Sequence, residues 1–406
     1  MFWIFIVAVY VLLDAYAYQV FKTLTGRKWI YIGYLVFSLA ILANLIFQFY
    51  ADDSSEWAGG RGYAVGFFLA IFSLKLILVI FMFGEDILRF IVGGAKKLFS
   101  KKSKFQLPGR RRFVSQLALG LAAIPFSSLL YGMYKGKYNF RVLKYTLYFE
   151  DLPEAFDGYR ISQISDIHSG SFEDPEEIQY GVDLLNDQKS DIVFFTGDLV
   201  NNTASEMRDW KEIFGSIKAN DGVYSVLGNH DYGDYHRWDS EEDKEANLEE
   251  MKKVQADMGW KLLLNEHAFV KRGKDRLALV GVENWGEGFK KSGDLSLASE
   301  GLTEKDFKIL LSHDPSHWQS QIKKDPKFFH LTLSGHTHGM QFGIEIPGWI
   351  RWSPAKFRYK NWAGIYEEYG RYINVNRGFG YIGYHGRVGI WPEISVIELR
   401  RGSRPA

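Results

Sequence analysis

Two histidines, His336 and His338, stand one residue apart between glycines, directly after a short apolar run over residues 329–333. Imidazole nitrogens are common ligands of divalent transition metals. A His-x-His pair also arises by chance on protein surfaces, so a metal site requires further ligand residues elsewhere. Because the chain has no cysteine, those ligands must be Asp, Glu, Asn or His.

Four other clusters of ligand-type residues each follow a short apolar run. In chain order they are Asp166-Ile167-His168, Gly197-Asp198, Gly228-Asn229-His230-Asp231 and Ser312-His313-Asp314. The carboxyl ends of strands in an open α/β sheet meet at one crevice, so we expect these residues to converge. Carboxylate, amide and imidazole ligands in this mixture suit Mn, Fe, Zn or similar divalent ions.

The elements that position these clusters are short strands separated by helices. The predicted strands cover residues 160–164, 191–195, 223–227, 277–280, 308–311, 331–333, 372–375 and 394–399. The predicted helices cover residues 175–188, 205–217, 241–258 and 303–307. This alternation predicts an α/β domain in residues 138–406, which is large enough to bury a full core.

The five clusters in this order resemble the calcineurin-like metallophosphoesterase superfamily, over roughly residues 155–400. The segments 375–380 and 392–394 are similar to the branch of bacterial membrane-anchored, often twin-arginine-exported, phosphoesterases. The resemblance implies an α/β sandwich of two sheets flanked by helices. It also implies hydrolysis of phosphomonoester, phosphodiester or pyrophosphate bonds by a metal-bridging hydroxide.

The resemblance further implies two divalent metal ions, which would be Mn, Fe or Zn. The first ion would be held by Asp166, His168, Asp198 and His338. The second ion would share Asp198 and be held by Asn229, His313 and His336. A shared carboxylate makes physical sense because it screens the repulsion between two neighbouring cations. Alternate residues reach in different directions, so we expect the two histidines of the His-x-His pair to serve different ions.

Catalytic and substrate-binding roles are also expected for residues near these ligands. His230 and Asp231 are the candidate catalytic residues, and His230, beside Asp231, would protonate the leaving oxygen or support charge on the phosphate. Arg377 is a candidate phosphate contact, and a structural salt bridge is its alternative. His317 lies four residues after His313 and is a candidate to orient it.

Aromatic and basic residues alternate in two segments beyond the ligands, residues 346–352 and 356–362. This composition is typical of segments that rest at lipid headgroups, with rings inward and cations on phosphates. We therefore predict membrane contact by Trp349, Trp352 and Trp362, which would present a lipid-borne phosphate to the metals. The alternative is that these rings pack a family-specific subdomain.

The N-terminal third differs from the rest in composition. Apolar stretches of spanning length cover residues 2–21, 29–50, 63–83 and 113–131. Each is close to the ~20 residues that a helix needs to cross the hydrocarbon core of a bilayer. The sequence thus predicts a four-helix transmembrane domain in residues 1–137. Asp14 and Lys75 fall at similar depth within their spans, and we expect them to form an ion pair because isolated charges in lipid are costly.

Basic residues in the loops predict the orientation. Lys22, Arg27 and Lys28 lie in the first loop and nine basic residues lie in the third, whereas the second has only Arg61 beside three acidic residues. The positive-inside rule then places the phosphoesterase domain outside a bacterial cytoplasmic membrane. The segment 110–114 resembles a twin-arginine signal kept as an anchor. Ordinary positive-inside charge is the alternative for these arginines.

Charge also separates the two parts. The whole chain has 49 Lys and Arg and 48 Asp and Glu; residues 1–137 hold 16 and 6, so the remainder holds 33 and 42. An acidic domain does not provide the basic field that nucleic acid requires, so no nucleic-acid partner is expected.

The expected partners are the lipid bilayer and a phosphorylated substrate that is lipid-linked or part of the cell envelope. One alternative function is a membrane sensor or scaffold that binds metal or phosphate without turnover. Another is a cytoplasmic-facing pyrophosphatase acting on a lipid A precursor, as in similar membrane-bound relatives. The predicted orientation counts against this second alternative.

Overall fold

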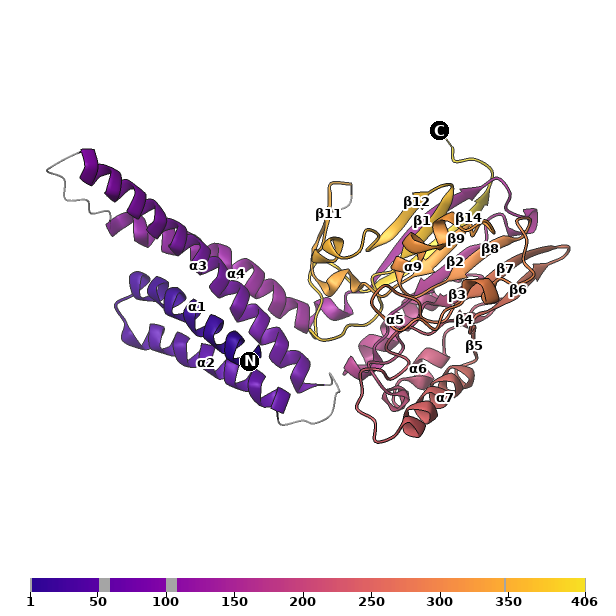
Figure 1. Ribbon diagram of the computed structural model, residues 1–406, viewed down its shortest axis with the longest axis horizontal. Helices are drawn as coiled ribbons and strands as arrows, with labels where there is room; N and C mark the ends of the chain where they lie inside the picture. The colour runs from indigo at the N-terminus through magenta and orange to yellow at the C-terminus, as the bar shows by residue number, and fades with distance from the viewer. Residues whose placement is uncertain (1, 51–58, 100–107, 347, 406) are drawn as a thin grey trace. The chain divides into compact units, whose positions relative to one another are not determined.

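The computed structural model describes residues 2–50, 59–99, 108–346 and 348–405 (Figure 1). The chain divides into two compact units. The first, here called the helical unit, comprises Met1–Asp53 and Gly60–Tyr134, and the second, the sandwich unit, consists mainly of Lys135–Ala406.

The helical unit contains four long helices: α1 (Phe2–Leu24), α2 (Lys28–Tyr50), α3 (Gly60–Phe99) and α4 (Pro108–Tyr134). All four are long and apolar enough to cross a membrane, which confirms the four predicted spans. The α3 helix is 40 residues long, and at a rise of about 1.5 Å per residue it exceeds a bilayer core of about 30 Å. It therefore continues well past the span predicted to end at residue 83.

Buried polar residues connect three of these helices. Lys75 lies 2.8 Å from the Asp14 carboxylate, which confirms the predicted ion pair. Tyr34 donates a hydrogen bond to Asp14 (2.7 Å), and Lys75 donates one to Ser38 (2.6 Å). The Lys75 ammonium also lies 3.0 Å from the centroid of the Tyr10 ring. Each charge thus has several partners inside the bundle, as an apolar surrounding requires.

Arg111, one of the candidate twin-arginine residues, is part of a second polar cluster. Its guanidinium donates to Asp86 (2.7 Å) on α3 and to Gln19 (2.8 Å) on α1. This arginine therefore ties three helices together, whatever its role in export. The loop residues 51–58 and 100–107, which carry much of the charge used for the orientation, lie outside the described residues, so the orientation stays a prediction.

The sandwich unit is built on two six-stranded sheets (Figure 1). The first sheet has the order β1 (Arg141–Phe149), β14 (Glu393–Arg401), β2 (Arg160–Ile164), β3 (Ile192–Phe195), β4 (Val223–Ser225) and β5 (Trp260–Leu262). The second has the order β12 (Gly364–Glu368), β13 (Arg371–Val375), β9 (Leu331–Ser334), β8 (Phe307–Leu311), β7 (Asp275–Gly281) and β6 (Glu266–Arg272). A separate hairpin pairs β10 (Ile344–Ile346) with β11 (Ile350–Trp352).

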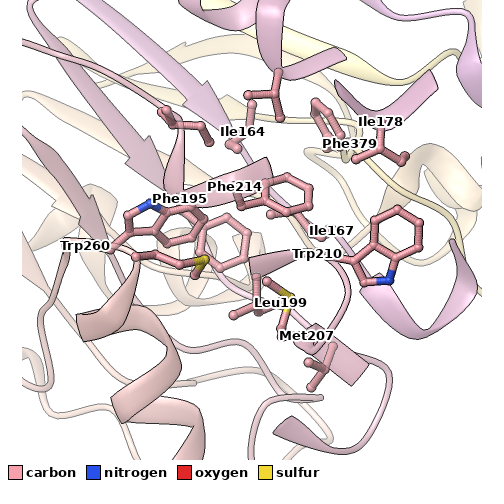
Figure 2. Packing of buried hydrophobic residues seen from close by; sticks show 14 of the residues in the cluster. Ile164, Ile167, Ile178, Phe195, Leu199, Met207, Trp210, Phe214, Trp260 and Phe379 are labelled. Atoms are coloured by element: carbon pink, nitrogen blue, oxygen red, sulfur yellow. The ribbon is translucent and has the colours of Figure 1, made fainter. Parts of the chain in front are cut away.

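Three apolar layers hold the sandwich together, and their burial supplies most of its stability. The middle layer lies between the sheets and includes Phe194 from the first and Leu279 from the second. On the outer face of the first sheet, helices α5 (Pro175–Asn186), α6 (Lys211–Gly215) and α7 (Glu241–Asp257) close a second layer, part of which Figure 2 shows around Phe195 and Phe214. Helices α8 (Leu295–Ala298) and α9 (Pro315–Ser320) cover the second sheet around Trp318. The predicted class, two sheets flanked by helices, is confirmed.

Strands β2, β3 and β4 run parallel to one another, and so do β7, β8, β9 and β13. The carboxyl ends of the strands in each set therefore lie at one edge of their sheet.

Two predicted helices differ from the structure. Residues 303–307 are not helical, because Asp306 accepts hydrogen bonds from the backbone and hydroxyl of Thr303 and so forms a turn before β8. The predicted helix at 205–217 is split into η4 (Ala204–Met207) and α6.

Candidate metal centre

The predicted ligands all lie in the loops that follow five strand ends. Asp166 and His168 follow β2, Asp198 follows β3, and Asn229 follows β4 in the first sheet, while His313 follows β8 and His336 and His338 follow β9 in the second. The two sheets thus contribute ligands from facing edges. The structure brings the carboxylate and imidazole ligands together into two clusters.

The first cluster consists of Asp166, His168 and His338, and all three side chains are buried. Nε2 of His338 lies 3.0 Å from Nε2 of His168 and 3.2 Å from a carboxylate oxygen of Asp166. Three potential ligand atoms therefore converge on one point, as a small cation requires.

The second cluster consists of Asp198, His313 and His336. Nε2 of His313 lies 3.1 Å from Oδ2 of Asp198 and 3.2 Å from Nδ1 of His336. The two histidines of the His-x-His pair thus belong to different clusters.

Asp198 connects the clusters. The same oxygen, Oδ2, that approaches His313 also lies 3.6 Å from Nε2 of His168 in the first cluster. Its other oxygen accepts a hydrogen bond from the backbone of His230 (2.9 Å), which fixes the orientation of the carboxylate. A carboxylate in this place can contact cations on both sides.

The side-chain oxygen of Asn229 indicates that the site fits a metal cation. Its amide nitrogen donates to the Tyr235 hydroxyl (3.0 Å), whereas its carbonyl oxygen is buried and has no hydrogen-bond partner. A buried acceptor without a donor costs about 1–3 kcal/mol. An ion held by the neighbouring cluster would satisfy this oxygen, so the donor set fits the implied metal.

The backbone at the ligands is strained. Five of the seven predicted ligands have positive φ angles: Asp166 (52°), His168 (50°), Asp198 (60°), His336 (71°) and His338 (48°). Side chains other than glycine rarely adopt this region, and each such residue costs about 1–2 kcal/mol. Backbone hydrogen bonds from Asp166 to Gly197 and from His168 to Asp198 hold two of these conformations in place. Such strain is typical of functional sites.

Burial and charge set the protonation of these groups. Burial opposes ionisation of Asp198, but the imidazoles of His313 and His230 hold the pKa of its carboxyl well below the usual range. Burial lowers the pKa of His168 well below its usual value, so this ring is neutral and offers a lone pair. Burial opposes protonation of the ligand His313, but the charge of Asp198 raises the pKa of this ring to about 10. His168 is therefore ready to bind a metal ion as a neutral ring, whereas His313 would have to release a proton to do so.

His230 lies at the rim of this site. Its ring makes an edge contact with His168, with centroids 4.9 Å apart, and its Nδ1 lies 2.7 Å from the carbonyl oxygen of Asn201. Tyr235 lies against its other side, with ring centroids 4.5 Å apart. These neighbours fix the ring so that Nε2 is the atom left for proton transfer.

Asp231 has a different environment from the one expected beside His230. Its carboxylate accepts hydrogen bonds from the backbone of Gly228 (2.8 Å), Asp198 (2.9 Å) and Leu199 (2.7 Å). Burial and the nearby Asp198 charge raise the pKa of Asp231 to about 7. Its hydrogen bonds thus hold together the loops that carry Asp198 and Asn229. In the described part of the chain, none of its hydrogen bonds is with the His230 ring.

Residues that the sequence did not single out also hold the ligands. Tyr359 lies 2.9 Å from Nε2 of His336, and Arg387 lies 3.1 Å from Nδ1 of His338. The carbonyl of Thr196 lies 2.7 Å from Nδ1 of His313. Partners of this kind orient ligand rings. They come from distant parts of the chain, so no local spacing could have revealed them.

His317 does not orient His313 as expected. Its Nδ1 lies 2.9 Å from the Ser312 hydroxyl, and its ring is stacked on Trp285 with centroids 4.5 Å apart.

Arg377 is buried in ion pairs with Glu393 and Glu345 (2.7 Å to the latter). This is the structural salt bridge that the sequence left open. A phosphate would have to displace a buried carboxylate to reach the guanidinium, so phosphate binding by Arg377 has no support from its surroundings.

The three tryptophans predicted to contact lipid differ in exposure. Trp349 is 81% exposed and Trp352 is half-buried. Trp362 is only 5% exposed and packs in a small cluster with Ala355 and Ile390, so the prediction of lipid contact is wrong for this residue. The alternative, packing within a subdomain, holds for Trp362.

Comparison with known proteins matches both units. Residues 1–137 match the family described as probable calcineurin-like phosphoesterase, transmembrane domain, and residues 159–340 match the family described as calcineurin-like phosphoesterase. A transmembrane protein with metallophosphoesterase domain from Danio rerio is 26% identical over 388 residues, which cover 92% of this chain and 81% of the relative. An uncharacterized metallophosphoesterase from Bacillus subtilis is 26% identical over 303 residues, which cover 72% of this chain and 97% of the relative.

Proposed function

Because the chain belongs to the calcineurin-like phosphoesterases, with a transmembrane domain in residues 1–137 and a phosphoesterase domain in residues 159–340, we propose that it is a membrane-anchored hydrolase of phosphoester bonds. It would use two divalent metal ions, Mn, Fe or Zn. The substrate would carry a phosphomonoester, phosphodiester or pyrophosphate group on a lipid-linked or envelope molecule.

The observation that carries this proposal is the position of Asp198. One oxygen of its carboxylate lies 3.6 Å from His168 and 3.1 Å from His313, so it stands between the two ligand clusters. A single-ion or purely structural site does not need a carboxylate shared in this way. The position of this carboxylate therefore supports a two-metal site, in which one carboxylate would contact both ions.

The first ion would be held by Asp166, His168, Asp198 and His338, and the second by Asp198, Asn229, His313 and His336. When bound, the ions would clamp a phosphoryl group and activate water for attack on phosphorus.

The remaining chemistry belongs to the chain. His230 would donate a proton from Nε2 to the leaving oxygen, because Nδ1 is held by the Asn201 carbonyl. Asp231 would keep the loops that carry Asp198 and Asn229 in register through its backbone hydrogen bonds. His230 is therefore proposed as the catalytic residue and Asp231 as a positioning residue.

The proposal is tested with the full-length protein purified in detergent. We expect Mn-dependent hydrolysis of bis-p-nitrophenyl phosphate, which Asp198→Asn abolishes. Glu242→Gln, at an exposed position on α7, is the matched control and should retain wild-type activity. If the wild-type protein binds two ions yet hydrolyses no phosphoester with any divalent metal, it is a non-catalytic binding protein and the proposal fails.

A further inference from the structure

The hairpin of β10 (Ile344–Ile346) and β11 (Ile350–Trp352) stands apart from both main sheets (Figure 1). Four of its apolar side chains are exposed: Ile344, Ile346, Trp349 and Ile350. Ile346 and Ile350 are cross-strand partners, so they flank the turn that carries Trp349. Several exposed apolar side chains on one short hairpin indicate an interaction site rather than an ordinary surface.

A cavity of about 580 Å³ adjoins the hairpin. Its wall includes Glu345 and Arg351, which are paired across the two hairpin strands, and the edge strand β1. The residues that line it include four basic ones, Arg141, Lys144, Arg351 and Arg377, and two acidic ones, Glu345 and Glu393. The cavity therefore has an excess of positive charge.

The four basic residues of this cavity differ in whether they already have a partner in the protein. Arg377 is neutralised by both glutamates, and Arg351 donates to the carbonyl oxygen of Ala363 (2.8 Å). Arg141 and Lys144 are exposed, and within the described part of the chain neither side chain has an ion pair or hydrogen bond. The structure thus leaves two cations without an ion pair on the edge strand that borders this cavity, and the cavity is large enough for a phosphate-bearing headgroup.

We propose that the hairpin and this cavity form a binding site for anionic phospholipid. The side chains of Ile346, Trp349 and Ile350 would enter the interfacial layer, and Arg141 and Lys144 would bind the headgroup phosphate. Tryptophan and aliphatic residues beside cations favour this layer. Four helices able to span a membrane keep a lipid surface available to this unit of the chain. The site does not involve the metal ligands, so the inference is independent of the proposed hydrolysis.

The absence of cysteine from the chain allows a direct test with the full-length protein in nanodiscs. A nitroxide is attached to Trp349→Cys and, as matched control, to Glu245→Cys at an exposed position on α7. In discs containing phosphatidylglycerol, the label at 349 should collide with oxygen more than with a water-soluble nickel chelate. The label at 245 should show the reverse order. Equal access of the chelate to both labels would overturn the proposal.

The role of the cavity is tested by titrating phosphatidylglycerol into neutral micelles that hold the protein labelled at residue 349. Arg141→Gln with Lys144→Gln should raise the midpoint of the change in label mobility about 30-fold, the factor expected for two basic side chains at an anionic surface. Lys252→Gln with Lys253→Gln on α7 removes the same charge and should leave the midpoint unchanged. An unchanged midpoint in the cavity variant contradicts the site. If inorganic phosphate alone produces the same change, the cavity binds a free anion and the lipid proposal is overturned.

Discussion

Nε2 of His168 lies 3.0 Å from Nε2 of His338, although 170 residues separate them in the chain. Two ring nitrogens this close repel each other through their lone pairs unless a proton or a cation lies between them. Burial keeps His168 neutral, and Asp166 adds a carboxylate oxygen 3.2 Å from the same nitrogen of His338. A hydrogen bond between the two rings or a bound cation would each relieve this repulsion, and the Asp166 oxygen beside them completes a group of three atoms that could hold a metal ion.

The two histidines of the His-x-His pair should serve different ions. His338→Ala should empty mainly the first site and His336→Ala mainly the second, because each contacts a different cluster. Metal analysis of each variant should find one ion of the two retained. Adding Asp166→Ala to His338→Ala should cost no further metal, whereas adding His313→Ala should remove the second ion. Loss of both ions in each single variant would break the assignment.

Substitutions of His230 and of Asp231 should change different properties of the protein. Asp231→Asn replaces a carboxylate that accepts three short backbone hydrogen bonds, so we expect a loss of about 3 kcal/mol in unfolding free energy and weaker metal retention. His230→Gln should leave stability and metal content unchanged but lower kcat about 10²–10⁴-fold, as loss of a general acid does. Unfolding curves, metal analysis and kinetics are measured on both variants. A kcat loss in Asp231→Asn with full stability would assign it a direct catalytic role.

The buried pair Asp14 and Lys75 should stabilise the helical unit jointly. Asp14→Asn or Lys75→Met leaves one uncompensated charge, and each should cost about 3–5 kcal/mol. The double variant should cost much less than the sum, because no charge remains unpaired. Unfolding of the detergent-extracted protein measures all three variants. Additive losses would show that the two charges do not stabilise each other.

His317 should make the stability of the sandwich unit depend on pH. Burial lowers the pKa of its imidazole to about 4 in the folded protein, against a usual value of 6.5. The unfolded chain therefore binds a proton that the folded chain does not. The neutral ring contributes fully to the free energy of unfolding above about pH 6.5. About 3 kcal/mol of this free energy is lost as the pH falls to about 4.

The variant His317→Gln isolates this effect, because the glutamine side chain has no titratable group. Unfolding free energies of the wild-type protein and this variant are measured across the same pH range. The wild-type stability should fall more steeply between about pH 6.5 and 4. Parallel curves would mean that the buried ring does not titrate in this window.

The side of the membrane on which the phosphoesterase domain lies can be decided with single cysteines. We expect Glu245→Cys to react with an impermeant maleimide in intact cells, because the loop charges place this domain outside. Thr25→Cys, between α1 and α2, should react only after permeabilisation. The opposite pattern would place the domain in the cytoplasm, where a nucleotide-linked lipid precursor would be available.

The sequence alone was sufficient for properties that depend on composition and local pattern. The four spans follow from their apolar length, and the pairing of Asp14 with Lys75 follows from the cost of charge in lipid. The ligand-type residues could be located because each follows a strand, and the parallel order within each sheet gathers those strand ends. These features require no knowledge of which distant segments meet.

Only the tertiary structure decided which groups surround those residues. Asp231 faces backbone amides, Arg377 faces two glutamates, and Trp362 lies in a core, although their sequence neighbours suggested other roles. Arg387 reaches His338 across 49 residues without any local signal. The physical reason is that periodicity specifies the face of an element, whereas the partner of a side chain depends on packing between segments far apart in the chain.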